Sequence, residues 1–194
     1  MKTMAFYFDY RSPYGYLAWT QFGRMPGSVD YRPMDIVDLM RKVENVPTSV
    51  ICSAKNRYVG KDLARWARRY GVPFARHPDA ATIDARRLLR ATLAAQRFDA
   101  MPVAVKAIYE ARWASAAPLS TADEVAALLG RAGLDAALLA QLIDDPALDQ
   151  DLDAATDQAA ADGVFGAPTF FVDDEMFFGN DRLDFVCERL GEPS

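Results

Sequence analysis

The chain opens with a strand, a helix and a second strand, and this order restricts its fold more than any other feature. Residues 4–8 form a short apolar run typical of a strand. Ser12 and Pro13 follow. Because serine is a favoured N-cap and proline suits the first helical position, a helix is predicted to begin here and to run to about Phe22. Residues 29–34 alternate apolar and polar side chains, which predicts a strand parallel to the first, reached by a right-handed crossover.

Strand patterns return only at the C-terminal end of the sequence. Residues 169–172 and 175–178 are predicted strands, and Asp173-Asp174 between them fits a two-residue hairpin turn. A last helix is predicted over residues 182–190, ended by Gly191. The fold class is therefore α/β, with a βαβ unit and a ββα unit far apart in the sequence.

The stretch between these two units has almost no strand pattern and becomes rich in alanine. We interpret it as a helical insertion. Thr121 and Glu124 have the spacing of a capping box. The acidic residues between 144 and 153 are expected to be solvated helix caps. The helices are predicted at residues 61–70, 85–96, 101–114, 121–132, 135–142 and 148–162.

Composition narrows the classes of function. The chain has 194 residues, of which 51% are hydrophobic, so it can bury a substantial core. Its formal net charge of -5 argues against a protein that binds nucleic-acid backbones. No apolar run is long enough to predict a membrane span. Charged residues come too early for a signal peptide, so a cytoplasmic location is expected.

Thiol, metal and triad chemistry have little support in the sequence. The two cysteines, Cys52 and Cys187, are far apart and form no CxxC motif. His77 is the single histidine and lies in a loop-like stretch, so neither a metal site nor a Ser-His-Asp triad is predicted. A reducing compartment agrees with this use of cysteine.

Three segments are candidates for a binding or catalytic site, and each also has a purely structural interpretation. Ser12 is either an ordinary N-cap or a hydroxyl placed where a helix start stabilises an anion. Pro168 is either a proline of the kind found where an edge strand begins, or a cis proline that leaves the backbone of Ala167 free to pair with a ligand. The run Gly179-Asn180-Asp181 either caps the last helix or binds the charged end of a ligand.

Taken together, these segments resemble a known family. The resemblance is carried by FYFDYRSPY at residues 6–14, DLARWA at 62–67, GVFGAPT at 163–169 and EMFFGNDRL at 175–183. Their order and spacing are similar to those of the 2-hydroxychromene-2-carboxylate isomerase family. That family is close to the kappa-class glutathione transferases and to the DsbA-like branch of the thioredoxin superfamily. Residues 47–52 depart from the pattern of the naphthalene-pathway isomerases.

The resemblance implies a thioredoxin-like domain formed by residues 1–38 and 163–194, with an all-helical domain inserted at 39–162. It also implies glutathione as the cofactor, a small aromatic substrate and a homodimer. Ser12 would be the catalytic residue, beside the glutathione sulfur, where its hydroxyl would favour the thiolate. The expected glutathione contacts are Ser12, Asn45, Ala167, Pro168, Gly179, Asn180 and Asp181.

The implied reaction interconverts 2-hydroxychromene-2-carboxylate, or a related aromatic compound, with trans-o-hydroxybenzylidenepyruvate by reversible thiolate addition. A kappa-class-like glutathione transferase would share every motif and is the main alternative. A DsbA-like oxidoreductase is disfavoured, because residues 12–15 contain no thiol. A non-catalytic glutathione-binding module is a further alternative.

Overall fold

The N-terminal unit has the predicted order. The computed structural model describes residues 2–46 and 51–191, so most of the divergent segment at 47–52 lies outside the described residues. β1 (Thr3–Phe8) leads through α1 (Pro13–Trp19) and a short 3-10 turn, η1 (Phe22–Arg24), to β2 (Ser28–Pro33). β1 and β2 pair in parallel, which confirms the predicted strand pair. The helix is shorter than expected, because the chain tightens into η1 after Trp19.

The C-terminal unit completes a four-stranded sheet in the order β2-β1-β3-β4. β3 (Thr169–Val172) and β4 (Glu175–Phe178) form the predicted hairpin, and β3 lies antiparallel to β1. The chain then passes through a 3-10 turn, η3 (Asn180–Arg182), before α10 (Leu183–Gly191). The last helix was therefore predicted correctly, but a separate turn precedes it.

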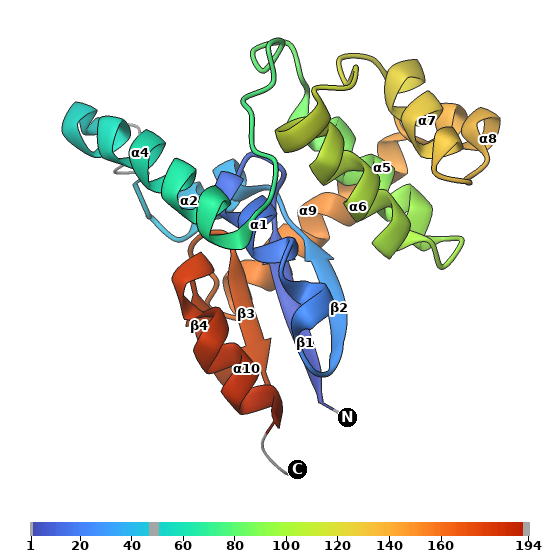
Figure 1. The fold of residues 1–194 in the computed structure, drawn as a ribbon. Coiled ribbons are helices and arrows are strands. Elements are labelled where there is room, and N and C mark those ends of the chain that lie inside the picture. Colours follow the sequence, from blue (N-terminus) through green and yellow to red (C-terminus); the bar gives the residue numbers. More distant parts are fainter. Residues whose placement is uncertain (1, 47–50, 192–194) are drawn as a thin grey trace.

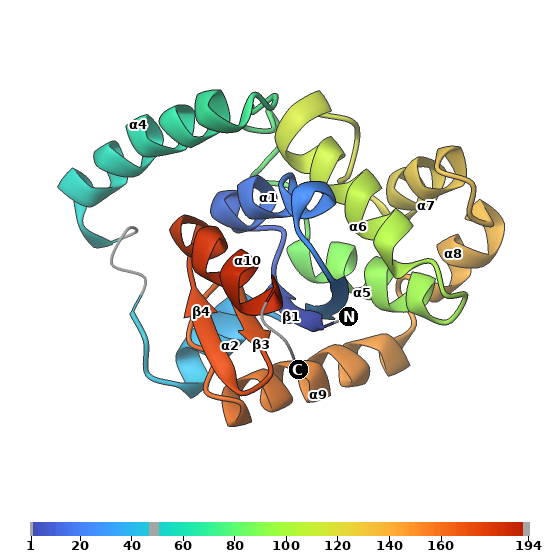
Figure 2. The same ribbon diagram turned by 60° about the horizontal axis from the view of Figure 1, so that its bottom comes forward.

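Helices cover both faces of this sheet (Figure 1). Met4, Phe6 and Phe8 of β1 point into the larger core, with side chains of α1 and α10. Tyr7 points to the opposite face, into a smaller core that also contains Leu39 of α2 (Ile36–Lys42). Figure 2 shows α9 running along the sheet on the side opposite to α10. The alternation along β1 thus produces a three-layer arrangement.

The helical insertion also has the predicted character. Its capping box, Thr121 with Glu124, is confirmed. None of the described helices is long and apolar enough to cross a membrane. The helices are α4 (Ser53–Tyr70), α5 (Ala85–Gln96), α6 (Met101–Glu110), the π-helical turn η2 (Ala111–Ser115), α7 (Ala122–Arg131), α8 (Ala136–Leu142) and α9 (Pro146–Ala161).

Three helix boundaries differ from the prediction. α4 begins eight residues before the predicted Lys61, because its first turns are polar and exposed and carry no apolar stripe. α6 ends at Glu110, where the backbone widens into η2 instead of continuing to Ala114. α9 begins at Pro146, capped by Asp145, whereas the apolar pattern starts only at Leu148.

α9 connects the helical part to the sheet. Leu148 and Leu152 belong to the larger core, whereas Ala159 belongs to the smaller core beneath the sheet. α2 crosses the expected domain boundary at residue 38. The division into residues 1–38 with 163–194 and residues 39–162 stays a prediction.

Candidate functional site

Ser12 lies at the junction between the central strand and the first helix. Its backbone N–H donates to the carbonyl oxygen of Asp9 at 2.9 Å, which turns the chain after β1. Its backbone is extended, and its hydroxyl accepts a hydrogen bond from the N–H of Gly15 at 3.1 Å. Pro13 occupies the first helical position. Ser12 is therefore the N-cap of α1, as its structural interpretation predicts.

The same hydroxyl also contacts the loop that precedes β3. Ser12 Oγ donates to the carbonyl oxygen of Ala167 at 3.0 Å. The sheet register explains the contact, because Tyr7 near the end of β1 is paired with Thr169 at the start of β3. The peptide bond between Ala167 and Pro168 is cis, as the second of the two interpretations of Pro168 requires. The Ser12 hydroxyl thus caps α1 and also binds the loop that precedes β3.

The third candidate segment meets the other two at this edge of the sheet. In the β3–β4 hairpin Phe178 pairs with Thr169, which returns the chain to the level of Pro168. Gly179 then donates its N–H to the carbonyl oxygen of Pro168 at 2.9 Å. Gly179 has φ +104, and a Cβ there would lie 2.6 Å from Asp181 Oδ1. Glycine is therefore required at this turn.

Asn180 and Asp181 differ sharply in environment. Asn180 is only 3% exposed, and within the described parts of the chain neither Oδ1 nor Nδ2 of its amide has a hydrogen-bond partner. The side chain of Asp181 is half exposed and forms an ion pair with Arg182 at 2.7 Å. Since buried amides are normally paired, the amide of Asn180 is the feature of this turn that a bound ligand would complete.

Asn45 is connected to the loop that precedes the cis proline. Its Nδ2 donates to the carbonyl oxygen of Phe165 at 2.7 Å, two residues before Ala167. The amide therefore holds the approach to the cis proline. Direct contact of Asn45 with glutathione stays a prediction.

α4 supplies polar side chains on the other side of α1. Tyr14 and Tyr58 both donate to the carboxylate of Asp62, at 2.9 and 3.2 Å. Burial, together with this carboxylate, raises the pKa of Tyr14. The hydroxyl of Tyr70 donates to the backbone oxygen of Asn180 at 3.4 Å. Sequence reasoning did not single out Tyr14, Asp62 or Tyr70, although DLARWA contributed to the resemblance.

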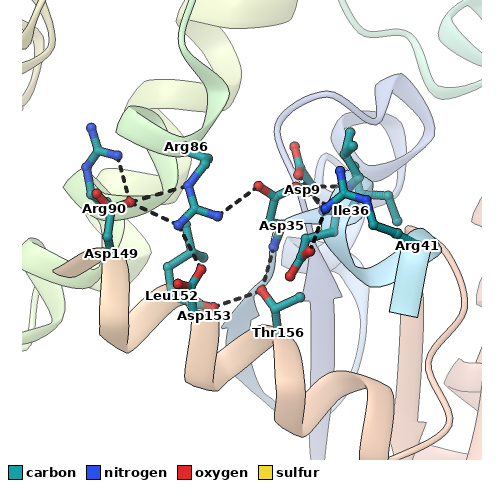
Figure 3. A network of polar contacts seen from close by, with 12 residues as sticks. Asp9, Asp35, Ile36, Arg41, Arg86, Arg90, Asp149, Leu152, Asp153 and Thr156 are labelled. Atoms are coloured by element: carbon teal, nitrogen blue, oxygen red, sulfur yellow. Dashed lines mark hydrogen bonds and ion pairs between the residues drawn. The ribbon is translucent and has the colours of Figure 1, made fainter. Parts of the chain in front are cut away.

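A buried charge network fixes the segment before Ser12 (Figure 3). Asp9 is fully buried and accepts from Arg11 Nε at 2.9 and 3.0 Å and from the N–H of Ile36 at 2.9 Å. Arg11 also pairs with Asp35, at 2.6 Å, and Asp35 is 4% exposed. The segment is therefore attached to the start of α2 through ion pairs whose carboxylates are buried, while the Arg11 side chain is 30% exposed.

The network continues into the helical part. Arg86 of α5 pairs with Asp35 at 3.2 Å and with Asp149 and Asp153 of α9 at 3.0 and 2.8 Å. Arg90 pairs with Asp149 at 2.9 Å (Figure 3). Asp144 likewise pairs with Arg87 and Arg90, at 3.2 and 3.0 Å. The expectation that the acids between 144 and 153 are only solvated caps was therefore wrong for Asp144, Asp149 and Asp153. Their partners lie about 60 residues away and leave no local pattern.

The other groups considered from the sequence lie away from Ser12 or lack partners suited to catalysis. His77 is buried, and its ring nitrogens contact the backbone of Ala117 and Asp79. The described residues contain no group of histidine, cysteine and acidic side chains able to hold a metal ion. A hollow of about 660 Å³ lies near the other end of α1, lined by Trp19, Phe22 and Tyr31 but by none of the candidate residues.

Comparisons with known proteins identify the family. A family model described as a DSBA-like thioredoxin domain matches residues 3–191. A 2-hydroxychromene-2-carboxylate isomerase of Sphingobium xenophagum is 36% identical over 194 residues, covering 97% of this chain and 98% of that protein. The chain belongs to the 2-hydroxychromene-2-carboxylate isomerase family. The resemblance inferred from the sequence and the thioredoxin-like fold with a helical insertion are both confirmed.

A solved structure and a second curated protein extend the comparison. The structure of a 2-hydroxychromene-2-carboxylate isomerase has a TM-score of 0.87 and 27% identity, covering 97% of this chain and 94% of that one. A protein named glutathione s-transferase kappa 2, from Caenorhabditis elegans, is 27% identical and covers 99% of this chain and 93% of its own. The predicted relation to kappa-class transferases is therefore also confirmed.

Proposed function

We propose that this isomerase-family protein uses glutathione to interconvert 2-hydroxychromene-2-carboxylate, or a related aromatic compound, with its ring-opened trans isomer. The observation that carries the proposal is the position of the Ser12 hydroxyl, at the start of α1 and 3.0 Å from the Ala167 carbonyl oxygen. Membership of the isomerase family supports the reaction class.

The residues present fit a bound glutathione. The unpaired amide of Asn180 is suited to the γ-glutamyl end, with the exposed carboxylate of Asp181 available for its ammonium group. The backbone of Ala167 would pair with the cysteinyl part, between Pro168 and Ser12. When bound, glutathione supplies a thiolate that adds reversibly to the conjugated double bond and allows rotation about it.

Ser12 would act as a hydrogen-bond donor. Its hydroxyl has one proton, which it donates to Ala167 in the structure. Turning that proton toward the sulfur would favour the charged form and lower the thiol pKa. No histidine or lysine contacts Ser12 within the described part of the chain, so it has no evident base to make it a nucleophile.

A kappa-class-like glutathione transferase is the second candidate, because of the 27% identity with a protein of that name over nearly the whole chain. It would use the same glutathione contacts but release a conjugate. We also propose a cytoplasmic homodimer. The free cysteines Cys52 and Cys187 agree with a reducing compartment.

Calorimetric titration with reduced glutathione, followed by ultraviolet assays on a panel of aromatic substrates, tests this proposal. We expect binding, and isomerisation of a hydroxychromene carboxylate only when glutathione is present. S-methylglutathione is the control, since it should bind but support no turnover. Absence of glutathione binding would overturn the proposal, and formation of a stable conjugate would favour the transferase.

A further inference from the structure

Arg112 lies near the candidate site but outside the charge network that holds it. It belongs to η2, the π-helical turn that follows α6. Its guanidinium carbon lies 4.3 Å from the centre of the Trp113 ring. Trp113 Nε1 in turn donates to the backbone oxygen of Tyr10 at 2.9 Å. The guanidinium is thus stacked on an indole that is bonded to the segment between β1 and Ser12.

One hydrogen-bond donor of Arg112 is not satisfied by the described residues. Its Nη1 atom is buried without a hydrogen-bond partner in the described residues, although the whole side chain is only partly buried. Asp9 is the acid whose charge acts on it, but that carboxylate already binds Arg11. Burial therefore lowers the pKa of Arg112, whereas acidic partners raise the pKa of Arg11. A buried donor without a partner is costly, so an anion that accepts from Nη1 would be favoured.

A second unpaired donor lies beside the start of α1. Tyr109 is fully buried, and its hydroxyl has no hydrogen-bond partner in the described chain. Tyr109 belongs to α6, whose end leads directly into the turn that carries Arg112. A Cβ on Gly15 would lie 2.8 Å from the Tyr109 hydroxyl and 3.5 Å from Ser12 Oγ. Unsatisfied donors are therefore found both beside the start of α1 and in the turn that follows α6.

We propose that Arg112 recognises the carboxylate group of the aromatic substrate, an inference that rests on the proposed function. The named substrate and its ring-opened pyruvate isomer both carry a carboxylate. A guanidinium is planar and binds carboxylates through paired hydrogen bonds, while its face stacks on an aromatic ring. The face of Arg112 is already on Trp113, which leaves its edge for the substrate.

The carboxylate is not altered by the isomerisation, so Arg112 should bind both substrate and transition state. Removing such uniform binding raises KM and leaves kcat nearly unchanged. Arg112 is thus a specificity-determining residue that discriminates acids from neutral analogues, and its role differs from that of Ser12.

The test compares Arg112→Met, which keeps the apolar stem, with the wild type on the substrate and on its methyl ester. We expect KM for the acid to rise about 10- to 100-fold, with little change for the ester. Arg97→Met is the matched control. Arg97 is exposed, and its one ion pair among the described residues is with Asp151, at 3.4 Å. An unchanged acid-to-ester KM ratio in Arg112→Met would overturn the inference.

Binding of trans-cinnamate, an unreactive aromatic carboxylate, gives a readout that does not depend on turnover. Calorimetry should show that Arg112→Met weakens cinnamate binding by a similar factor while glutathione affinity is retained. Arg112→Gln is a second neutral variant, should the methionine variant fold poorly. Cinnamate binding that depends on Arg112 supports the site even if no isomerase substrate is turned over, so the two proposals fail separately. Equal cinnamate affinity in the wild type and in a folded neutral variant would overturn the site.

Discussion

The hydroxyl of Ser12 donates to the carbonyl oxygen of Ala167 at 3.0 Å, although 155 residues separate the two positions in the sequence. The contact exists because β3 lies antiparallel to β1 in the centre of the sheet. It places the start of the first helix against the loop before the last strands. A ligand that pairs with Ala167 would consequently lie beside the Ser12 hydroxyl.

The buried amide of Asn180 leads us to predict that this residue contributes to glutathione affinity. Asn180→Ala removes no hydrogen bond made by this side chain within the described protein, so the free energy of unfolding should change by less than about 1 kcal/mol. Glutathione should bind about tenfold more weakly or worse, measured by calorimetry. Asn45→Ala is the comparison, because it deletes a 2.7 Å bond to Phe165 and should cost about 1 kcal/mol of stability. Unchanged glutathione affinity in Asn180→Ala would remove Asn180 from the site.

Substitutions at Gly15 and Tyr109 should have coupled effects on the free energy of unfolding. A Cβ at position 15 would lie 2.8 Å from the Tyr109 hydroxyl, and the Tyr109 ring is held by Tyr10 and Trp19. Gly15→Ala should therefore lower the free energy of unfolding by about 1–3 kcal/mol, although alanine favours helices.

The control variants distinguish this clash from a general effect. Tyr109→Phe removes an unpaired hydroxyl and should restore most of the stability lost in Gly15→Ala. Gly60→Ala, in α4 with open space around it, should be neutral or stabilising. Chemical denaturation of the four variants measures the coupling. Additive effects of Gly15→Ala and Tyr109→Phe would contradict it.

We predict that the free energy of unfolding depends on pH through the carboxyl group of Asp35. Burial raises its pKa, but Arg11 and the N–H groups at the start of α2 outweigh burial, so the net shift is downward. A lowered carboxyl pKa adds stability above its unfolded value of about 3.9 and loses it as the pH falls through the folded pKa. Asp35→Asn should cost about 1–3 kcal/mol at pH 7 and less at pH 3. The cost is moderate because Arg11 keeps its ion pair with Asp9 and Arg86 keeps those with the acids of α9.

Urea denaturation between pH 3 and 7 checks this prediction. Asp30→Asn is the control, because Asp30 is half exposed and, in the part of the chain that the structure describes, pairs with Arg32 alone, at 2.8 Å. That change should cost less than about 1 kcal/mol at any pH. Equal losses for Asp35→Asn at pH 7 and pH 3 would show that the charge network contributes no pH-dependent stability.

Local signals in the sequence predicted much of the fold. The N-cap at Ser12 and the capping box at Thr121 depend on side chains within one helical turn, and so could be recognised without the structure. The hairpin at Asp173-Asp174 is equally local. The first turns of α4 were missed because Lys55, Asn56 and their neighbours carry no apolar periodicity.

The electrostatic part of the site could not be predicted in this way. In the sequence Asp9 is only the residue that follows an apolar run. The hydrogen bond that it accepts from the N–H of Ile36 depends on the tertiary structure. Arg86 pairs with residues 51, 63 and 67 positions away. Arg112 is recognisable only by the absence of a partner for its buried Nη1 among the described residues, and sequence patterns carry no such information.

Thiol–disulfide exchange should be absent. Residues 12–15 contain no cysteine, and burial raises the pKa of Cys187, which lowers its thiolate fraction. Insulin reduction should remain at background. The variant with both Cys52→Ser and Cys187→Ser should keep its glutathione-dependent activity. Insulin reduction that survives both substitutions would contradict our interpretation of the site.

Ser12→Ala tests the central role proposed for the hydroxyl. Loss of one donor aimed at an anion should slow glutathione-dependent isomerisation by about 10²-fold or more. Glutathione should still bind, because Ala167 and Asn180 would contact other parts of the tripeptide. Its thiol should titrate at higher pH, measured by ultraviolet thiolate absorbance, since the charged form has lost a hydrogen bond.

Because Ser12 also caps α1, Ser12→Ala should destabilise the protein by about 1 kcal/mol as well, and a control must separate the two effects. Thr121→Ala removes the N-cap of α7, whose side chain bonds the N–H of Glu124 and makes no contact with the site. It should lose similar stability but keep both the rate and the thiol titration. If Ser12→Ala also kept both, Ser12 would be a helix cap and nothing more, and the proposed function would lose its catalytic residue.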